Sequence, residues 1–388
     1  MVAAPVAPFR VQVPEEVLAD LRARLERARL PNQVEGVGWE HGTELGYLRE
    51  LVAHWRDGYD WRAEESRLNA IEQVVTEVDG QRIHLLHHRS PHPGALPIVL
   101  THGWPGSVVE FLDVLGPLAD PPDPADAFHV IVPSLPGYGF SGPTTAPGWH
   151  ARRIARAFGE MVDALGYPRF GVQGGDWGSI VSQNMADLFP ERVVGLHLNF
   201  VSLPPPKDLD PAELDDEAKA ILEARRAWQA HETGYSTLQG TRPQTVGYAL
   251  EDSPVGLLAY IVEKLRGWSD CGGDPETVFS RDRMLTNVML YWVTATATSA
   301  ARLYYEQRHA GAEAVPQQKV TVPTGVAVFP KEMGKTPRAW VERRYHVTHW
   351  SVMPRGGHFA AWEQPELFVE DVRAFFRPLR ETGSGDVR

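Results

Sequence analysis

Cysteine is nearly missing from this chain of 388 residues, in which Cys271 stands alone. A single cysteine cannot form an internal disulfide, so the fold does not depend on an oxidising compartment. The first thirty residues also contain no apolar run long enough for a secretion signal or a membrane span, and Pro5, Pro8 and Pro14 interrupt them. We therefore predict a cytoplasmic protein that has no membrane partner.

Positive charge is scarce as well. Lysine and arginine total 38 against 50 acidic residues, and only six of the 38 are lysines, which leaves a formal net charge of −12. Such a chain is a poor partner for nucleic acid or for an anionic membrane. With 43% hydrophobic and 23% charged residues, it can bury a sizeable core as one large domain or two ordinary ones. The composition, rich in arginine, alanine, glycine and proline, is typical of a GC-rich genome, and we expect a bacterial, actinobacterial source.

Strand-like and helix-like segments alternate along most of the chain. Residues 74–78 and 81–87 flank Asp79-Gly80, which is a strong hairpin signal. Short, largely apolar segments predict further strands, several of them covered on both faces, at 97–101, 129–133, 170–172, 193–198, 325–329 and 351–354. Helical patterns occupy 14–29, 45–55, 154–165, 180–189 and 367–376. This alternation predicts an α/β fold with a mostly parallel sheet.

Strand signals stop between residues 202 and 319. This segment instead carries helical patterns at 213–231, 255–264 and 283–305. We call 202–319 the helical insertion. Because it falls between two predicted strands of the sheet, we expect it to form a lid over a site at the sheet's edge.

The run from Gly174 to Ser179 (Gly-Gly-Asp-Trp-Gly-Ser) links a predicted strand to a predicted helix. A strand, a glycine-rich turn and a helix form a nucleophile elbow, which lifts one side chain above the sheet. Here that residue is Asp176, whose carboxylate is an anion at neutral pH and suits displacement at a saturated carbon. The alternative is a tight turn in which the aspartate caps the helix.

A nucleophile of this architecture is followed along the chain by an acid and then by a histidine. His358 lies on a glycine-rich loop after the last predicted strand, and Glu332 follows the strand before it. We predict that Glu332 orients His358 as the activator of water. The alternatives are a surface histidine and a solvated glutamate, with Glu306, Glu313 and Glu342 competing for the acid's role.

Backbone amides should stabilise an oxyanion beside Asp176. The amide of Trp177 follows the nucleophile, and the amide of Trp104 lies on a loop after an early strand. Pro105 has no N–H and restricts the residue before it, which helps to orient that peptide. We expect Trp104, Pro105 and Trp177 to contact the substrate as well; the alternative for this loop is a surface turn.

An opening epoxide develops negative charge on oxygen, which neutral O–H groups stabilise. Six tyrosines in the helical insertion are candidate donors, although such residues are more often core aromatics: Tyr235, Tyr248, Tyr260, Tyr291, Tyr304 and Tyr305.

Taken together, these motifs resemble those of the microsomal-type epoxide hydrolases of the α/β-hydrolase superfamily, over almost the whole chain. The motifs that carry the resemblance begin at Pro8, His102, Gly174, Thr286, Val322 and Arg355. The resemblance implies an α/β-hydrolase fold with an N-terminal region at 1–73 that wraps the core and lid, a core at 74–201 and 320–388, and the lid at 202–319. Membrane-bound family members carry an N-terminal apolar anchor. The first residues of this sequence do not resemble such an anchor, in agreement with the expected cytoplasmic location.

The resemblance also implies roles for individual residues. Asp176 matches the nucleophile, Glu332 and His358 match the charge-relay pair, and Tyr235 and Tyr304 match the lid tyrosines, with Tyr305 as a rival for the last assignment. It implies hydrolysis of a small-molecule epoxide to a diol through an ester on Asp176, without a metal or an organic cofactor.

Two other functions compete with this one. A haloalkane dehalogenase uses the same aspartate chemistry on a carbon–halogen bond, but the His-Gly-Trp-Pro loop and the two tyrosines disfavour it. A catalytically silent binding protein of the same fold is the second alternative. Abundant tryptophan and the helical lid predict an apolar or aryl epoxide. The composition resembles that of actinobacterial family members, and this resemblance implies a polyketide-derived epoxide and a role in antibiotic assembly. A homo-oligomer and a monomer both stay open.

Overall fold

A computed structural model describes residues 4–209, 214–314 and 318–381. Within these residues one sheet has nine strands in the order β1-β2-β3-β5-β4-β6-β7-β8-β9. The pairs β1–β2, β2–β3 and β3–β5 are antiparallel, and every pair from β5–β4 to β8–β9 is parallel. The strands are β1 (Ala7–Pro8), β2 (Gln73–Val78), β3 (Gln81–His88), β4 (Leu96–Thr101), β5 (Phe128–Pro133), β6 (Phe170–Gly174), β7 (Val193–Leu198), β8 (Val320–Val328) and β9 (Tyr345–Val352).

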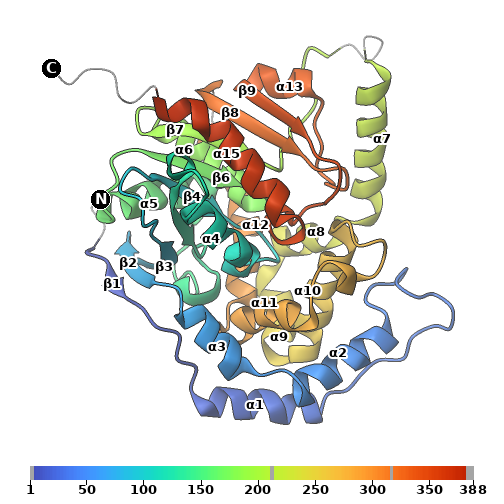
Figure 1. Cartoon of the computed structure of the whole chain (residues 1–388). Helices are drawn as coiled ribbons and strands as arrows, with labels where there is room; N and C mark the ends of the chain where they lie inside the picture. The colour runs from blue at the N-terminus through green and yellow to red at the C-terminus, as the bar shows by residue number, and fades with distance from the viewer. Residues whose placement is uncertain (1–3, 210–213, 315–317, 382–388) are drawn as a thin grey trace.

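Helices cover both faces of the sheet (Figure 1). One pair is α4 (Leu112–Ala119) with α15 (Pro365–Glu381), and the other is α5 (Ala151–Ala164) with α6 (Asp176–Leu188). Ile98, Val99 and Leu100 of β4 are fully buried between them, as expected for an apolar strand that is covered on both sides. The predicted mostly parallel α/β sheet is therefore confirmed.

The hairpin prediction is also confirmed. Val78 pairs with Gln81, and both turn residues, Asp79 and Gly80, have positive φ. This is the backbone conformation that the tight two-residue hairpin turn requires and that Asp-Gly adopts readily.

The described residues between β7 and β8 are mainly helical, and one predicted helix is divided in two. The expected single helix at 283–305 is two helices, because Ala295 adopts a left-handed conformation with φ 49° and ends the first of them. Glu213, the expected start of another helix, lies outside the described residues. The helices are α7 (Asp216–His231), α8 (Gly234–Thr241), α9 (Pro243–Asp252), α10 (Pro254–Trp268), α11 (Arg281–Thr294) and α12 (Ala297–His309).

The last two strands begin earlier than predicted. β8 begins at Val320 rather than 325, and its register shifts between Val320 and Pro323, where proline cannot donate a ladder hydrogen bond. β9 begins at Tyr345, six residues before the predicted 351. The sequence does not reveal residues 345–350 as a strand, because polar residues alternate there with apolar ones instead of forming a solid apolar run. A short helix, α13 (Arg338–Arg344), leads into it.

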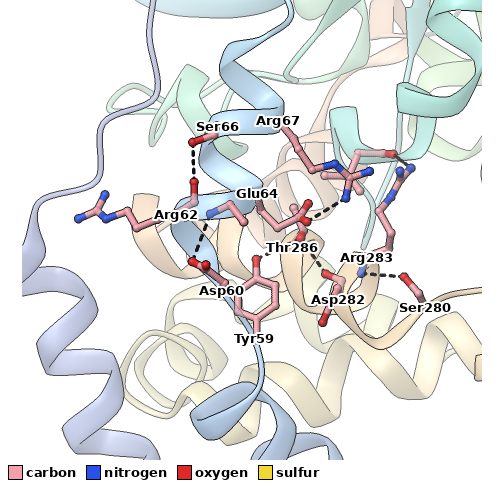
Figure 2. A network of polar contacts seen from close by, with 12 residues as sticks. Tyr59, Asp60, Arg62, Glu64, Ser66, Arg67, Ser280, Asp282, Arg283 and Thr286 are labelled. Carbon is pink, nitrogen blue, oxygen red and sulfur yellow. Dashed lines mark hydrogen bonds and ion pairs between the residues drawn. The ribbon is translucent and has the colours of Figure 1, made fainter.

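Three N-terminal helices pack along the helical insertion: α1 (Glu15–Glu26), α2 (Leu45–Asp57) and α3 (Trp61–Asn69) (Figure 1). The Thr43 hydroxyl donates to the Ala259 carbonyl at 2.7 Å, and Arg24 pairs with Asp252 at 2.7 Å. Figure 2 shows Tyr59, just before α3, pointing toward Thr286 of α11, and their hydroxyls lie 3.1 Å apart. The N-terminal helices therefore hold the insertion from the side away from the sheet.

Arg283 connects the insertion with the sheet domain. It lies on α11, is 9% exposed, donates to the Val109 carbonyl at 3.0 Å and pairs with Asp113 at 3.1 Å.

None of the helices in the described part of the chain combines the length and the apolar character that a membrane-spanning helix needs.

Arg283→Met should lower the free energy of unfolding by about 2–3 kcal/mol, since it leaves the buried Val109 carbonyl without its charged donor. Urea denaturation measures the change. Arg24→Met is the matched control, because its partly exposed pairs with Asp20 and Asp252 should contribute less than about 1 kcal/mol. Equal losses in the two variants would contradict the bridging role.

Candidate active site

Asp176 is the first residue of α6 and follows Gly175, which links β6 to this helix in a tight turn. Its φ of 46° is in the left-handed region, which a non-glycine residue occupies only where surrounding contacts hold it. Gly178 permits this turn, since an added Cβ there would lie 1.8 Å from the Thr101 carbonyl oxygen. The helix cap is Gly175, and the Asp176 carboxylate makes no capping hydrogen bond. The elbow geometry is present, and the simple capping alternative is wrong.

The loop after β4 reaches the Asp176 carboxylate. The Trp104 amide donates to Asp176 Oδ1 at 2.8 Å. Gly103 makes this approach possible, because an added Cβ would lie 2.2 Å from the same oxygen. His102 supports the loop by accepting from the Leu135 amide at 3.2 Å, and burial lowers the pKa of His102 to about 4, so its ring is neutral. One predicted oxyanion amide thus already binds the carboxylate, and the other, that of Trp177, follows it in α6.

Helix α11 fixes the rest of this loop. Asn287 donates to the Pro105 carbonyl at 2.8 Å and accepts from the Ser107 hydroxyl at 2.7 Å. The Tyr291 hydroxyl donates to the Gly106 carbonyl at 2.6 Å. Both residues belong to the motif that begins at Thr286, but from the sequence Asn287 has no assigned role and Tyr291 is one of six candidate donors to a leaving oxygen. The available signal was two polar side chains four residues apart, on one face of a helix.

His358 lies between two carboxylates. Its Nδ1–H donates to Glu332 at 2.9 Å, and its Nε2 lies 3.4 Å from Asp176 Oδ2. The amides of Met333 and Gly334 donate to Glu332 and orient it. Burial disfavours the imidazolium, but the charges of Glu332 and Asp176 outweigh burial and hold the pKa of His358 well above its ordinary range. The structure therefore brings the three predicted triad residues together.

Glu363 holds the loop that carries His358. No motif in the sequence marks this residue. It accepts from the amides of Gly357 and Phe359, each at 2.9 Å, and from the Asp270 amide at 2.7 Å. Burial raises the pKa of Glu363 to about 7, while these hydrogen bonds oppose the rise. Since Asp270 follows α10, this carboxyl ties the histidine loop to the helical insertion.

Tyr235 and Tyr304 meet above Asp176 from α8 and α12. Their ring centroids are 5.8 Å apart, and each is 9% exposed. Tyr235 stacks on Trp104 at 4.9 Å, and Tyr304 packs perpendicular to Trp177 at 4.8 Å. Burial and the Asp176 charge raise the pKa of Tyr235. Burial, followed by the nearby Tyr235 and Asp176, raises the pKa of Tyr304. Both phenols therefore stay protonated and can donate hydrogen bonds.

The structure separates Tyr304 from its neighbour. Tyr305 is 36% exposed and stacks on His309 at 4.0 Å, away from Trp177 and Tyr235. Tyr248 is exposed, and Tyr291 binds the Gly106 carbonyl. Tyr260 packs edge-on against Trp104. Of the six candidates, the two tyrosines that the resemblance implies are the two that line one cavity together with Asp176.

A cavity of about 780 Å³ opens beside these groups, which is within the size range of small-molecule sites. Its lining includes Asp176, Trp177, Tyr235, Tyr304, Phe200 and Trp340. Of the three residues expected to contact a substrate, Trp177 lines this cavity. Trp104 and Pro105 do not line it. Trp104 packs behind Tyr235 and Tyr304, and the Pro105 carbonyl is bound by Asn287. In the described part of the chain, no group of three His, Cys, Asp or Glu residues is placed to hold a metal ion.

The sequence is similar to proteins of known family. A family described as "Epoxide hydrolase N terminus" matches residues 6–111, and one described as "alpha/beta hydrolase fold" matches residues 97–245. A Stigmatella aurantiaca protein whose name assigns it to the epoxide hydrolases is 47% identical, over 97% of this chain and 86% of its own. Epoxide hydrolase 1 of Sus scrofa is 38% identical, over 97% of this chain and 89% of its own. The crystal structure of juvenile hormone epoxide hydrolase from the silkworm Bombyx mori superposes with a TM-score of 0.91 at 31% identity, covering 98% of this chain and 96% of that one.

Asp176→Asn should lower the pKa of His358, because it removes one of the two charges that stabilise the imidazolium. NMR titration of the imidazole protons measures this pKa. Asp282→Asn, which removes a carboxylate paired with His54 at the surface, is the matched control and should leave it unchanged. An unchanged pKa in the Asp176 variant would show that the two side chains are not coupled.

Proposed function

The chain belongs to the epoxide hydrolase family, whose members are cofactor-independent hydrolases, and from this premise we propose that it opens an apolar epoxide to a vicinal diol through an ester on Asp176. One observation carries the proposal. The Asp176 carboxylate and the phenols of Tyr235 and Tyr304 face one cavity, so that a nucleophile and two O–H donors can reach the same small ring.

In the first step, Tyr235 and Tyr304 donate hydrogen bonds to the epoxide oxygen while Asp176 attacks a ring carbon. The Trp104 amide already holds Oδ1, so Oδ2 is the oxygen that forms the new bond. The carbon–oxygen bond of the ring breaks, its electron pair moves to the epoxide oxygen, and a phenol supplies the proton. Hydrogen bonds aimed at this developing charge lower the barrier.

The second step depends on the charge that the first removes. Esterified Asp176 is neutral and no longer stabilises the His358 imidazolium, so the pKa of His358 falls. The imidazolium loses its proton through solvent to the tyrosinate that the first step leaves, and the neutral ring can then act as a base. His358, oriented by Glu332, takes a proton from water as the water oxygen attacks Cγ of Asp176. The amides of Trp104 and Trp177 hold the tetrahedral oxyanion. When it collapses, the bond between Cγ and the alkyl oxygen breaks, the His358 imidazolium protonates that oxygen, and the diol leaves.

An apolar substrate suits the aromatic and aliphatic lining of the cavity. The cytoplasmic location, the choice between a monomer and a homo-oligomer, and a role in antibiotic assembly stay predictions.

One turnover in ¹⁸O-labelled water, with protein in excess over epoxide, should place the label in the Asp176 carboxylate and leave the first diol unlabelled. This result follows because water attacks the ester carbonyl rather than the epoxide. Mass spectrometry of a peptide containing Asp176 and of the diol reads both positions, and His358→Gln should accumulate the intact ester. Label in the first diol would rule out the covalent route.

Tyr304→Phe should slow ester formation about 100-fold, because it removes one of the two donors to the epoxide oxygen. Rapid-quench measurement of the ester under single-turnover conditions gives this rate. Tyr305→Phe is the matched control on the same helix and should change the rate less than about twofold. The assignment fails if the Tyr305 variant is the slower of the two.

A further inference from the structure

A second, much smaller space lies beside Asp176. Its volume is about 10 Å³, which is room for roughly one water molecule. Asp176 lines both this space and the large cavity, whereas Tyr235 and Tyr304 line the large cavity and not this space. The small space is bounded by Gly103, Trp104, Glu110, Asp176, His358 and Phe359, among others.

Glu110 is the one carboxyl group besides Asp176 in this lining. It lies in a single turn of 3-10 helix, Val108–Phe111, directly after the loop that carries Trp104. Gly106 of that loop leaves room for it, since an added Cβ would lie 1.5 Å from Glu110 Oε1. The Glu110 carboxyl therefore occupies the space that a side chain at position 106 would fill.

The charged groups that act on Glu110 are His358 and Asp176. Burial raises the pKa of Glu110 to about 8, with the His358 charge and the Gly103 amide opposing the rise and Asp176 adding to it. At neutral pH the group is therefore mostly an uncharged carboxyl. Its carbonyl oxygen can accept a hydrogen bond without adding a second anion next to the nucleophile.

We propose that Glu110 holds the hydrolytic water in this small space. Its carboxyl oxygen accepts a hydrogen bond from one O–H of the water, and His358 Nε2 takes the proton of the other O–H. The water oxygen then attacks Cγ of esterified Asp176, and the electron pair of the carbonyl moves to the oxygen that the Trp104 amide binds. Glu110 itself neither gains nor loses a proton in this step.

The two spaces separate the two half-reactions. After the first step, the alkyl group bound to Asp176 occupies the large cavity beneath the tyrosines. Water that waits in the small space still has access to the ester, next to the base that activates it. This inference rests on the proposed function, because it requires an ester on Asp176.

Single-turnover kinetics of Glu110→Gln and Glu110→Leu test the inference by measuring ester formation and ester hydrolysis separately. Leucine removes the acceptor, so hydrolysis should slow about 100-fold while ester formation changes less than about threefold. Glutamine keeps an acceptor oxygen, so its hydrolysis should slow less, about threefold to tenfold. A purely structural role would slow both half-reactions together.

Glu65→Gln is the matched control, because that buried carboxyl binds the Val13 amide at 2.7 Å, outside both cavities. It should change neither rate. Hydrolysis at the wild-type rate in the leucine variant overturns the inference. If that variant forms no ester, the glutamine variant decides, and unchanged hydrolysis there overturns it. Absence of an ester in the wild-type protein would instead refute the proposed function.

Discussion

The Asp176 carboxylate is bound at one oxygen by the Trp104 amide and faces His358 with the other, at 3.4 Å. Opposite charges at this distance, shielded from water, interact far more strongly than they would in bulk solvent. This attraction raises the pKa of His358, and in the proposed mechanism it disappears when Asp176 is esterified. One electrostatic contact therefore sets the protonation of the base and couples it to the state of the nucleophile.

The partners of Asp176 come from separate parts of the chain, and the helical insertion helps to position them. Helix α11 holds the loop of Trp104 through Asn287 and Tyr291. The end of α10 is tied to the His358 loop through Glu363, which accepts from the Asp270 amide. The insertion thus positions the loops of Trp104 and His358 and also carries Tyr235 and Tyr304. The N-terminal helices bind its outer side, so they support the site without touching it.

Much of the fold was predictable because its signals are local. The turn at Asp79-Gly80 and the apolar strand β4 each follow from a few neighbouring residues. The break between α11 and α12 was not, since Ala295 has no intrinsic preference for the left-handed conformation and adopts it because of its surroundings. β8 and β9 were placed late because Pro323 and alternating polar residues hide their first halves.

The sequence alone determined the kind of chemistry, because an aspartate in an elbow, a late histidine and a glycine-rich loop are ordered along the chain as the reaction requires. Only the tertiary structure decided which side chains surround them. Tyr304 and Tyr305 are adjacent in α12 and point about 100° apart, so packing against Trp177 selects one. Glu110 and Glu363 are ordinary glutamates in the sequence. They acquire their roles from burial beside groups that are remote along the chain, and local sequence does not encode such distant contacts.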